Sequence, residues 1–476
     1  MMSGEPTRAT ERTRPRNVIF MVADGMSTGV PSIAEPFSQL VRGRGTHWAA
    51  LARDPRTARG WCDTASLGSL VTDSAAASSA WATGTRVMNG SLNVLPDGRR
   101  LTPIGVLAKQ SGRQVGLVTT TTITHATPAG FVAVHPSRDD ESAIATQYLN
   151  ASDVLLGGGR KFFDGALRAD RRDLLSEFAA AGYRISESRA SLLSTTTAGR
   201  LLGLYGTGHL PYVIDRQLDA SLETVPTLAE MATSALGVLG NARRGFLLQI
   251  EGGRVDHAAH VNDAAGALWE MLAFDDALGV ALDFARRKAD TLVVVTSDHG
   301  NSNPGLNGLG NDYGGSTKGL ELLAGFKSSS GIMLQRLRDE RDSQGRVREP
   351  RVSEVILDLC GIKLSAEEAA TLATAAGGPL PSELNNQHAN ASGIFAEVLG
   401  NHTGIGWTGM SHTSDVTMVL ATGPGQDRFA GLKLNTETFA ALTAFMDVPF
   451  VNPAMSSEEA GRHATGPADE PAPHWL

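Results

Sequence analysis

Four short apolar runs, each ending in polar residues, constrain the fold of this chain more than any other feature. They are NVIFMVAD (17–24), VGLVTTTTIT (115–124), GFLLQIEGG (245–253) and TLVVVTSDHG, which ends at residue 300. Continuous apolar runs rich in β-branched residues are typical of strands buried on both faces of a parallel sheet. Helical patterns lie between and around these runs, and together they predict an α/β fold. The stretches with helical patterns are 103–112, 167–182, 227–240 and 263–287.

The chain of 476 residues divides into a large folded part and two polar ends. Residues 1–16 are polar and basic and are expected to be a disordered lead-in, while 453–476 are acidic, contain several prolines and are expected to be a flexible tail. Residues 17–452 form the expected main domain. From about residue 301 the composition shifts to Gly, Asn and Ser and then to a charged patch, which predicts a loop-rich insertion at about 301–405.

Composition excludes several classes of partner and location. A formal charge of −8 argues against nucleic acid or an anionic membrane surface as a partner. The chain has no run of roughly 18 apolar residues, so we expect no membrane span, and its N-terminal residues lack the apolar stretch of a signal peptide. Cys62 and Cys360 are too few for a disulfide scaffold or a thiolate metal site. One disulfide between them and two free thiols are both compatible with the sequence.

Acidic residues stand at the ends of three of the four apolar runs. Asp24, Glu251 and Asp298 follow or close these predicted strands. The carboxyl ends of parallel strands share one edge of a sheet, where ligand sites lie. Carboxylates gathered there repel one another unless cations neutralise them. His299 directly follows Asp298, so one sharp turn can aim both side chains at a cation, and we predict a metal centre at this edge.

Further histidines extend the predicted metal centre. Asp256 and His260 are four residues apart in EGGRVDHAAH, so on a helix they share one face and form a pair suited to Zn²⁺. His412, in SHTSDVTMVLATGPG, precedes another strand-like run and can complete one site from a distance. His402, in NHTG, is its rival, and we interpret it mainly as a loop histidine.

Other residues are suited to a phosphoryl group and a hard cation. Ser74 opens a run of small residues in DSAAASSAWATG, and a helix beginning there would present its N-terminus to an anion. The hydroxyl of Thr127 joins Asp24 and Glu251 in an oxygen-rich set suited to Mg²⁺. Arg138 offers a planar fork that matches two phosphate oxygens, its alternative being a surface salt bridge.

These segments together resemble the alkaline phosphatase family. DSAAASSAWATG is similar to its nucleophile motif, NVIFMVADGM to its first metal strand and HATPAGFVAVHPSR to its Thr-and-Arg segment. EGGRVDHAAH, TSDHG and the SHT segment are similar to its remaining metal motifs, in the family's order, and the resemblance covers about 17–450. It implies a large central, mostly parallel sheet with helices on both faces, two Zn²⁺ with an adjacent Mg²⁺, and a homodimer.

The resemblance also assigns ligands to three cations. His412 is preferred to His402 because its spacing to Gly423 and Pro424 matches the family pattern. Ser74 would join the second set when deprotonated. The three sets, for the first zinc, the second zinc and the magnesium, are Asp256, His260 and His412; Asp24, Asp298 and His299; and Asp24, Thr127 and Glu251.

Two histidines stand where branches of the family differ. His125 and His257 occupy positions at which the best-known bacterial form carries Asp and Lys, and at which animal-type members carry histidines. We expect both to lie beside the substrate. An imidazole near the third cation would let Zn²⁺ or Co²⁺ compete with Mg²⁺. His257 is expected to reach the phosphate through water and to titrate in the working pH range.

The resemblance implies an enzyme that hydrolyses small-molecule phosphate monoesters through a covalent phosphoserine on Ser74, with Arg138 holding the phosphoryl oxygens and a loosely specified leaving group. It also implies a periplasmic or secreted location. A sulfatase on the same scaffold would need x-P-x-R after its nucleophile, whereas Ser74 is followed by alanines. A phosphodiesterase would rarely need Arg138 and a third cation. A binding protein without turnover predicts broken ligand sets, and each set has its residues.

Overall fold

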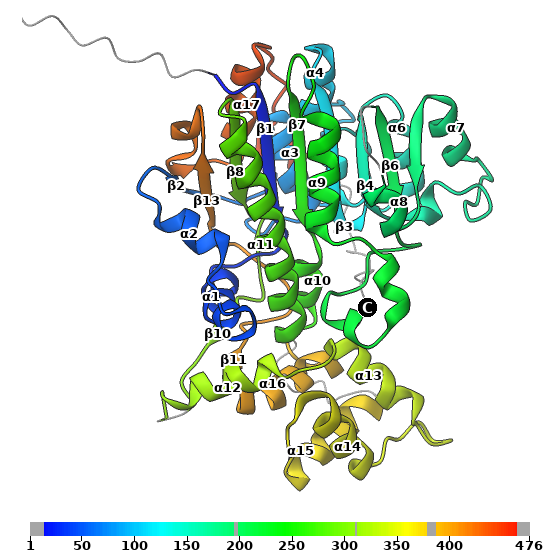
Figure 1. Ribbon diagram of the computed structural model, residues 1–476, viewed down its shortest axis with the longest axis vertical. Helices are drawn as coiled ribbons and strands as arrows, with labels where there is room; N and C mark the ends of the chain where they lie inside the picture. The colour runs from blue at the N-terminus through cyan, green and yellow to red at the C-terminus, as the bar shows by residue number, and fades with distance from the viewer. Residues whose placement is uncertain (1–13, 195–198, 310–311, 378–386, 464–476) are drawn as a thin grey trace, which may run out of the picture.

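A ten-stranded sheet runs through the centre of the molecule (Figure 1). The computed structural model describes residues 14–194, 199–309, 312–377 and 387–463, so most of the expected lead-in and tail lies outside the described residues. The strand order is β14-β2-β13-β8-β1-β7-β3-β4-β6-β5, and β13 alone among these described strands runs antiparallel to its neighbours. The strands are β1 (Asn17–Ala23), β2 (Ala58–Cys62), β3 (Gln114–Thr122), β4 (Val154–Gly158), β5 (Tyr183–Ser186), β6 (Arg200–Leu204), β7 (Phe246–Gly252), β8 (Thr291–Thr296), β13 (Thr417–Thr422) and β14 (Gly431–Lys433).

The central strand β1 shows why the apolar runs are continuous. Successive side chains of a strand point to opposite faces. Ile19 and Met21 pack into the core on one face of the sheet, and Phe20 and Val22 pack into a separate core on the other. Because helices cover both faces, every position of β1 is buried. The prediction of an α/β fold with a mostly parallel central sheet is therefore confirmed.

Helices cover the two faces of the sheet as separate layers. Helices whose apolar side chains enter the first core include α1 (Gly29–Arg42), α9 (Leu228–Leu239) and α11 (Ala264–Arg287). Helices that enter the second core include α3 (Ser74–Thr83), α4 (Ile104–Gln110), α7 (Leu174–Ala180) and α17 (Glu437–Met446). The four stretches expected to be helical contain α4, α7, α9 and α11. The remaining helices of this body are α2 (His47–Arg53), α5 (Ala126–Gly130), α6 (Glu141–Gln147), α8 (Arg189–Leu193), α10 (Arg254–His260) and α18 (Ser457–Gly461).

The insertion is more regular than its composition predicted. Instead of an irregular loop region, it carries α12 (Gly315–Ala324), α13 (Ser330–Asp339), α14 (Glu349–Cys360), α15 (Ala366–Gly377) and α16 (Ala391–Thr403). The expectation of a loop-rich segment was wrong because its many polar residues mask short amphipathic stripes. In α13, Met333, Leu334 and Leu337 share one buried face. These helices form a layer below the carboxyl edge of the sheet in Figure 1, joined to the body by β10 (Gly305–Leu306) and β11 (Ile405–Gly406).

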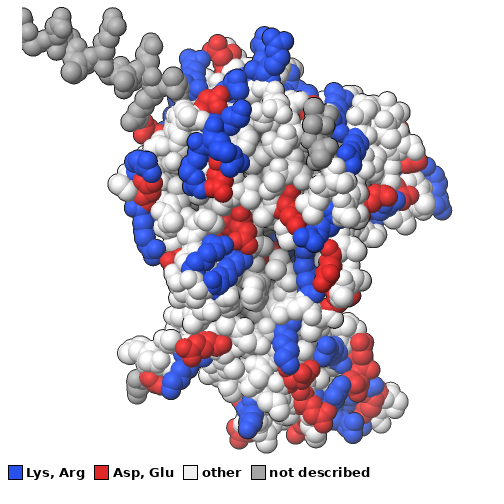
Figure 2. Space-filling view, in the orientation of Figure 1, with Lys and Arg blue, Asp and Glu red and all other residues white. Residues whose placement is uncertain are grey.

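Three expectations about the chain as a whole can be compared with the structure. Cys62, in β2, and Cys360, in α14, are both buried free thiols, so the disulfide alternative is excluded. Among the described residues, helices long and apolar enough to cross a bilayer are absent. On the face shown in Figure 2, basic and acidic side chains are interspersed rather than gathered in a basic patch.

Candidate metal centre

Strand register brings the predicted acids to one edge of the sheet. In β1, Val22 lies opposite both Glu251 of β7 and Thr296 of β8. Asp24 and Asp298 follow directly beyond these paired positions, so the three carboxylates emerge together. Each is at most 2% exposed. A cluster of buried carboxylates is costly unless positive charge accompanies it.

Carboxylates and imidazoles at this edge form three compact groups that could each hold a cation. Within each group the candidate ligand atoms lie within 4.8 Å of one another. The edge of the sheet thus offers three neighbouring candidate cation sites that share side chains. The groups are Asp256, His299 and His412; Asp24, Asp298 and His299; and Asp24, His125 and Glu251.

These groups overlap the expected ligand sets without matching them in every member. The second contains the three residues expected for it. In the first group, His299 takes the place of the expected His260. His260 lies directly beside the group, with its Nε2 3.3 Å from Oδ2 of Asp256. In the third, His125 lies beside the two expected acids, and Thr127 is close by, its Oγ1 3.5 Å from Oδ2 of Asp24.

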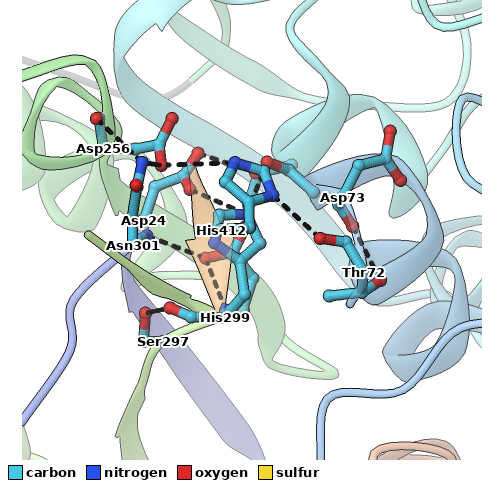
Figure 3. A network of polar contacts seen from close by, with 12 residues as sticks. Asp24, Thr72, Asp73, Asp256, Ser297, His299, Asn301 and His412 are labelled. Carbon is cyan, nitrogen blue, oxygen red and sulfur yellow. Dashed lines mark hydrogen bonds and ion pairs between the residues drawn. The ribbon is translucent and has the colours of Figure 1, made fainter. Parts of the chain in front are cut away.

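The facing imidazoles of His260 and His412 fit a bound cation. The Nδ1 atom of His412 lies 2.8 Å from the carbonyl oxygen of Thr72, and that of His260 lies 2.9 Å from the carbonyl oxygen of Met410. A carbonyl only accepts, so each Nδ1 carries a proton, and in a neutral ring the Nε2 then presents a lone pair. The two Nε2 atoms are 2.9 Å apart. That of His412 also lies 3.6 Å from Oδ1 of Asp256 (Figure 3). A cation bound by both nitrogens relieves the repulsion between these lone pairs.

Unpartnered oxygens point to the same conclusion for the other two groups. Oδ1 of Asp24, Oδ2 of Asp298 and Oε1 of Glu251 are buried and have no hydrogen-bond partner among the described residues. Burial, followed by the charge of Asp298, raises the pKa of Asp24 well above its ordinary value. Burial also raises the pKa of Glu251 to about 7. Bound cations would stabilise the ionised carboxylates and supply the missing partners.

Burial keeps the imidazoles of His299 and His412 neutral, as metal ligands must be. It lowers the pKa of His299 to about 4 and, with the nearby His299, that of His412 to about 3. The same cause applies to His257, where burial and then the charges of His209 and Arg254 lower the pKa well below its ordinary value. The expectation that His257 titrates in the working pH range was therefore wrong, because the sequence did not reveal how deeply it is buried.

Ser74 is the first residue of α3 and faces the second group. Asp73 caps this helix by accepting a hydrogen bond from the N–H of Ala76 at 2.9 Å. The Oγ of Ser74 lies 3.2 Å from Nε2 of His299. All ten residues of α3 are buried, which explains why they are mostly Ala, Ser and Thr. A helix N-terminus beside a serine hydroxyl and cation ligands is suited to an anionic group.

Arg138 belongs to the site rather than to the surface. Its side chain is only 16% exposed. Nη1 donates to Oδ2 of Asp73 at 2.9 Å, and Nη2 lies 3.1 Å from Nε2 of His125. The alternative of a solvated surface salt bridge is excluded by this burial. The guanidinium is thereby fixed beside the start of α3, with its fork available to an anion there.

A third histidine, His209, was missed in the sequence. Its ring centroid lies 4.6 Å from that of His257 and 5.8 Å from that of His125. Its Nδ1 accepts from the N–H of Thr122 at 3.0 Å, so it packs beside two imidazoles that were predicted. Arg254 fixes His257 from another direction, with Nη1 2.6 Å from its Nδ1. His209 stands alone in a loop after β6, and nothing in its local sequence indicates the site.

His402 lies away from the three groups, as expected for a histidine outside the metal centre. It is not in a loop, however, but in a helix. It belongs to α16 of the insertion, and its Nε2 pairs with Oε1 of Glu368 in α15 at 2.9 Å. His412 instead stacks on His299, with ring centroids 3.6 Å apart. The structure thus brings His412, and not its rival, to the metal centre.

A buried set of acids and imidazoles at the carboxyl edge of a parallel sheet, facing a serine at a helix N-terminus, defines an α/β metalloenzyme built around an anionic group. The family model for alkaline phosphatase matches residues 15–448, and the chain belongs to the alkaline phosphatase family. The resemblance inferred from the sequence motifs is confirmed, and the chain is an enzyme of this family.

Individual relatives agree with this assignment over most of their length. Alkaline phosphatase 4 of Bacillus subtilis (strain 168) is 32% identical over 438 residues, which are 90% of this chain and 88% of that protein. Alkaline phosphatase 3 of the same organism is 33% identical, covering 89% and 87%. The crystal structure of Thermus thermophilus alkaline phosphatase is similar with a TM-score of 0.86 and 36% identity, covering 97% of this chain and 99% of that one. Family membership supports hydrolysis of phosphate monoesters by a metal-dependent enzyme.

Proposed function

We propose that this enzyme hydrolyses phosphate monoesters through a covalent phosphoserine on Ser74. The observation that carries the proposal is the position of the Ser74 hydroxyl, 3.2 Å from Nε2 of His299 and at the N-terminus of α3. There the serine oxygen bonds to phosphorus while the bond from phosphorus to the alcohol breaks. The serine proton is released, and the departing alcohol oxygen takes up a proton. Water then attacks the phosphoserine, which regenerates Ser74 and releases inorganic phosphate.

The three groups of ligands are proposed to hold two Zn²⁺ and one Mg²⁺. Asp256, His260 and His412 would hold the first zinc, and the group around Asp298 and His299 the second. When bound, these cations would lower the pKa of the serine hydroxyl and offset charge on the attacking and departing oxygens.

The third cation is proposed to lie between Asp24 and Glu251, with Thr127 as a further oxygen ligand. Oxygen ligands suit Mg²⁺, whereas the imidazole of His125 in the same group favours Zn²⁺ or Co²⁺. We therefore propose that the third site accepts either kind of cation.

The side chains around Ser74 are proposed to recognise the phosphoryl group itself. Arg138, fixed by Asp73, would bind two of its non-bridging oxygens, and the N–H groups of the first turn of α3 would face the same charge. His125 and His257 would complete the wall on the side of the third group. Because these contacts involve only the phosphoryl group, many leaving groups should be accepted.

The assembly, domain extent and location of the enzyme are further proposals. Trp61 and Leu432 are paired across β2 and β14 and are 40% and 70% exposed, and Leu434 close by is 51% exposed. Apolar side chains in such a group are suited to a homodimer contact. Residues 17–452, which the family match nearly spans, would act as one catalytic domain. Members of the family are often periplasmic or secreted, and we propose the same for this protein.

The test of the nucleophile is the substitution Ser74→Ala. It should reduce hydrolysis of a phosphate monoester by roughly a thousandfold or more, because no other group can take over the covalent step. Metal content measured by atomic emission should stay as in the unmodified enzyme. Acid quenching with a radiolabelled substrate should trap labelled protein only when Ser74 is present. Ser91→Ala, at a serine that bonds the carbonyl of Pro136, is the control; full activity or labelling of Ser74→Ala would refute the assignment.

A further inference from the structure

Two threonines of β3 hold one oxygen of Glu251, an acid of the third ligand group. β3 lies between β7 and β4 in the sheet (Figure 1), and Thr119 stands directly opposite Glu251 in the ladder with β7. The Oγ1 of Thr119 donates to Oε2 of Glu251, and the Oγ1 of Thr121 lies 3.3 Å from the same oxygen. All three residues are fully buried, so water does not compete for this contact.

The donors and acceptors around Thr119 fix the direction of the contact. Its Oγ1 accepts from the N–H of Thr121 at 2.9 Å and lies 2.7 Å from the Oγ1 of Thr121. An ionised carboxylate only accepts, so the single hydroxyl proton of Thr119 points to Glu251. In the contact between the two hydroxyls, Thr121 is then the donor. Thr121 thus supports Thr119 through both its N–H and its hydroxyl.

Thr119 and Thr121 lie in an irregular stretch of β3. Val118 pairs with Leu156 of β4, but the next pairing joins Thr122 to Gly158, so four steps along β3 match two along β4. Extra residues of this kind form a bulge, which re-aims side chains and is common beside functional sites. Here the bulge contains the two threonines that meet Glu251.

The glycines of β4 leave room for this bulge. Three consecutive glycines occupy positions 157–159 of the segment LLGGGRKFF. A Cβ atom at Gly157 would lie 2.9 Å from Cγ2 of Thr119, and one at Gly159, whose φ is 88°, would lie 2.9 Å from Cβ of Thr122. Side chains there would displace the bulge from β4. The glycine run therefore serves the close packing that places Thr119.

The other oxygen of Glu251 is the one left for a cation. Oε1 is buried and has no hydrogen-bond partner among the described residues. Glu251 belongs to the group in which ligand atoms of Asp24, His125 and Glu251 lie within 4.8 Å of one another. A carboxylate whose second oxygen is held by hydroxyl groups is oriented to bind a cation through one oxygen rather than two.

We propose that Thr119 is a positioning residue of the third cation site and that, by holding Oε2 of Glu251, it makes this site select small cations against Ca²⁺. This inference rests on the third site proposed above. Ca²⁺ takes roughly six to eight oxygen ligands and accepts both oxygens of a carboxylate, whereas Mg²⁺ requires a smaller, nearly octahedral set. Release of Oε2 would add an oxygen and loosen the carboxylate, and both changes suit Ca²⁺.

The test compares Thr119→Val with the unmodified protein, since valine has nearly the shape of threonine without its hydroxyl. Each protein is loaded with two equivalents of Zn²⁺ and dialysed against equal concentrations of Mg²⁺ and Ca²⁺, and bound metals are measured by atomic emission. The ratio of bound Mg²⁺ to Ca²⁺ should fall about tenfold in Thr119→Val and stay within about twofold in Thr119→Ser, which keeps the hydroxyl. Zinc content should be equal in all three proteins.

Thr122→Val is the matched control. Thr122 lies on the same strand and also donates to a glutamate, but its partner Glu141 belongs to none of the three groups. The ratio should stay unchanged in this variant. If Thr119→Val does not fold, Thr119→Ala removes the same hydroxyl and gives the same comparison.

Two results would overturn the role of Thr119. One is an unchanged ratio in the folded variant that lacks the hydroxyl, and the other is an equal fall of the ratio in Thr122→Val. A different result bears on the proposed function itself. If the unmodified protein binds neither Mg²⁺ nor Ca²⁺ in addition to zinc, the third site is refuted before any variant is made.

Discussion

Asp73 holds Arg138 in place while it caps the helix that begins at Ser74. Its Oδ2 accepts from Nη1 of Arg138 at 2.9 Å, and its Oδ1 accepts from the N–H of Ala76 at 2.9 Å. One carboxylate therefore sets both the start of α3 and the direction of the guanidinium. The proposed nucleophile and the proposed phosphate ligand are positioned by the same side chain.

Arg138→Ala is expected to weaken inhibition by inorganic phosphate. Loss of a two-pronged, charge-assisted contact should raise the inhibition constant roughly tenfold to a hundredfold, because such contacts contribute about 1.5–3 kcal/mol. The measurement is competitive inhibition at fixed pH, with zinc and magnesium content determined on the same samples. Arg138→Lys should recover only part of the affinity, since an ammonium is not a fork. An unchanged inhibition constant in Arg138→Ala would contradict the assigned role.

Replacing His412 and His402 separately should distinguish a metal ligand from a structural histidine. His412→Ala removes one of the two facing Nε2 atoms beside Asp256, so the protein should lose about one equivalent of tightly bound zinc and most of its activity. His402→Ala removes only the pair with Glu368 in the insertion. Zinc content after dialysis should therefore stay the same in His402→Ala. The reverse pattern would exclude His412 from the first ligand set.

His125→Asp should shift the third site toward magnesium. His125 shares a group with Asp24 and Glu251, and the substitution would replace its nitrogen by carboxylate oxygen. Oxygen ligands favour Mg²⁺, so its occupancy relative to Zn²⁺ should rise roughly tenfold after dialysis against both cations. Metal analysis of the variant and the unmodified enzyme gives this ratio directly. If the ratio does not change, His125 does not act at the third site.

Glu270→Gln should make stability less dependent on pH. Glu270 of α11 is buried, which raises its pKa to about 7, and its Oε1 accepts from the N–H of Val213 at 2.7 Å. The folded state therefore binds one more proton than the unfolded chain between about pH 4.5 and about pH 7, and the free energy of unfolding falls as pH rises through that window.

The variant keeps an acceptor at Oε1 but cannot ionise. The loss of stability between about pH 5 and about pH 8 should shrink by an amount on the order of 2–3 kcal/mol in urea titrations of the metal-loaded protein. Equal losses in the two proteins would show that Glu270 ionises as freely in the folded state as in the unfolded one.

Much of the metal centre could be predicted because its residues sit at strand ends. Asp24, Glu251 and Asp298 close apolar runs, and Asp256 and His260 are spaced for one helix face, so short stretches of sequence carry the signal. The insertion was mispredicted for the opposite reason. Its apolar positions, such as Met333 and Leu337, are sparse among polar residues and become a recognisable core only when five helices pack together.

The sequence by itself determined the α/β fold, the family and the identity of most candidate site residues, because local periodicity and short motifs encode them. Only the tertiary structure placed His412 on His299 and His402 beside Glu368, added His209 beside His257, and showed His257 to be too deeply buried to titrate near neutral pH. These features depend on burial and on contacts between residues far apart in the chain, which the order of amino acids does not state.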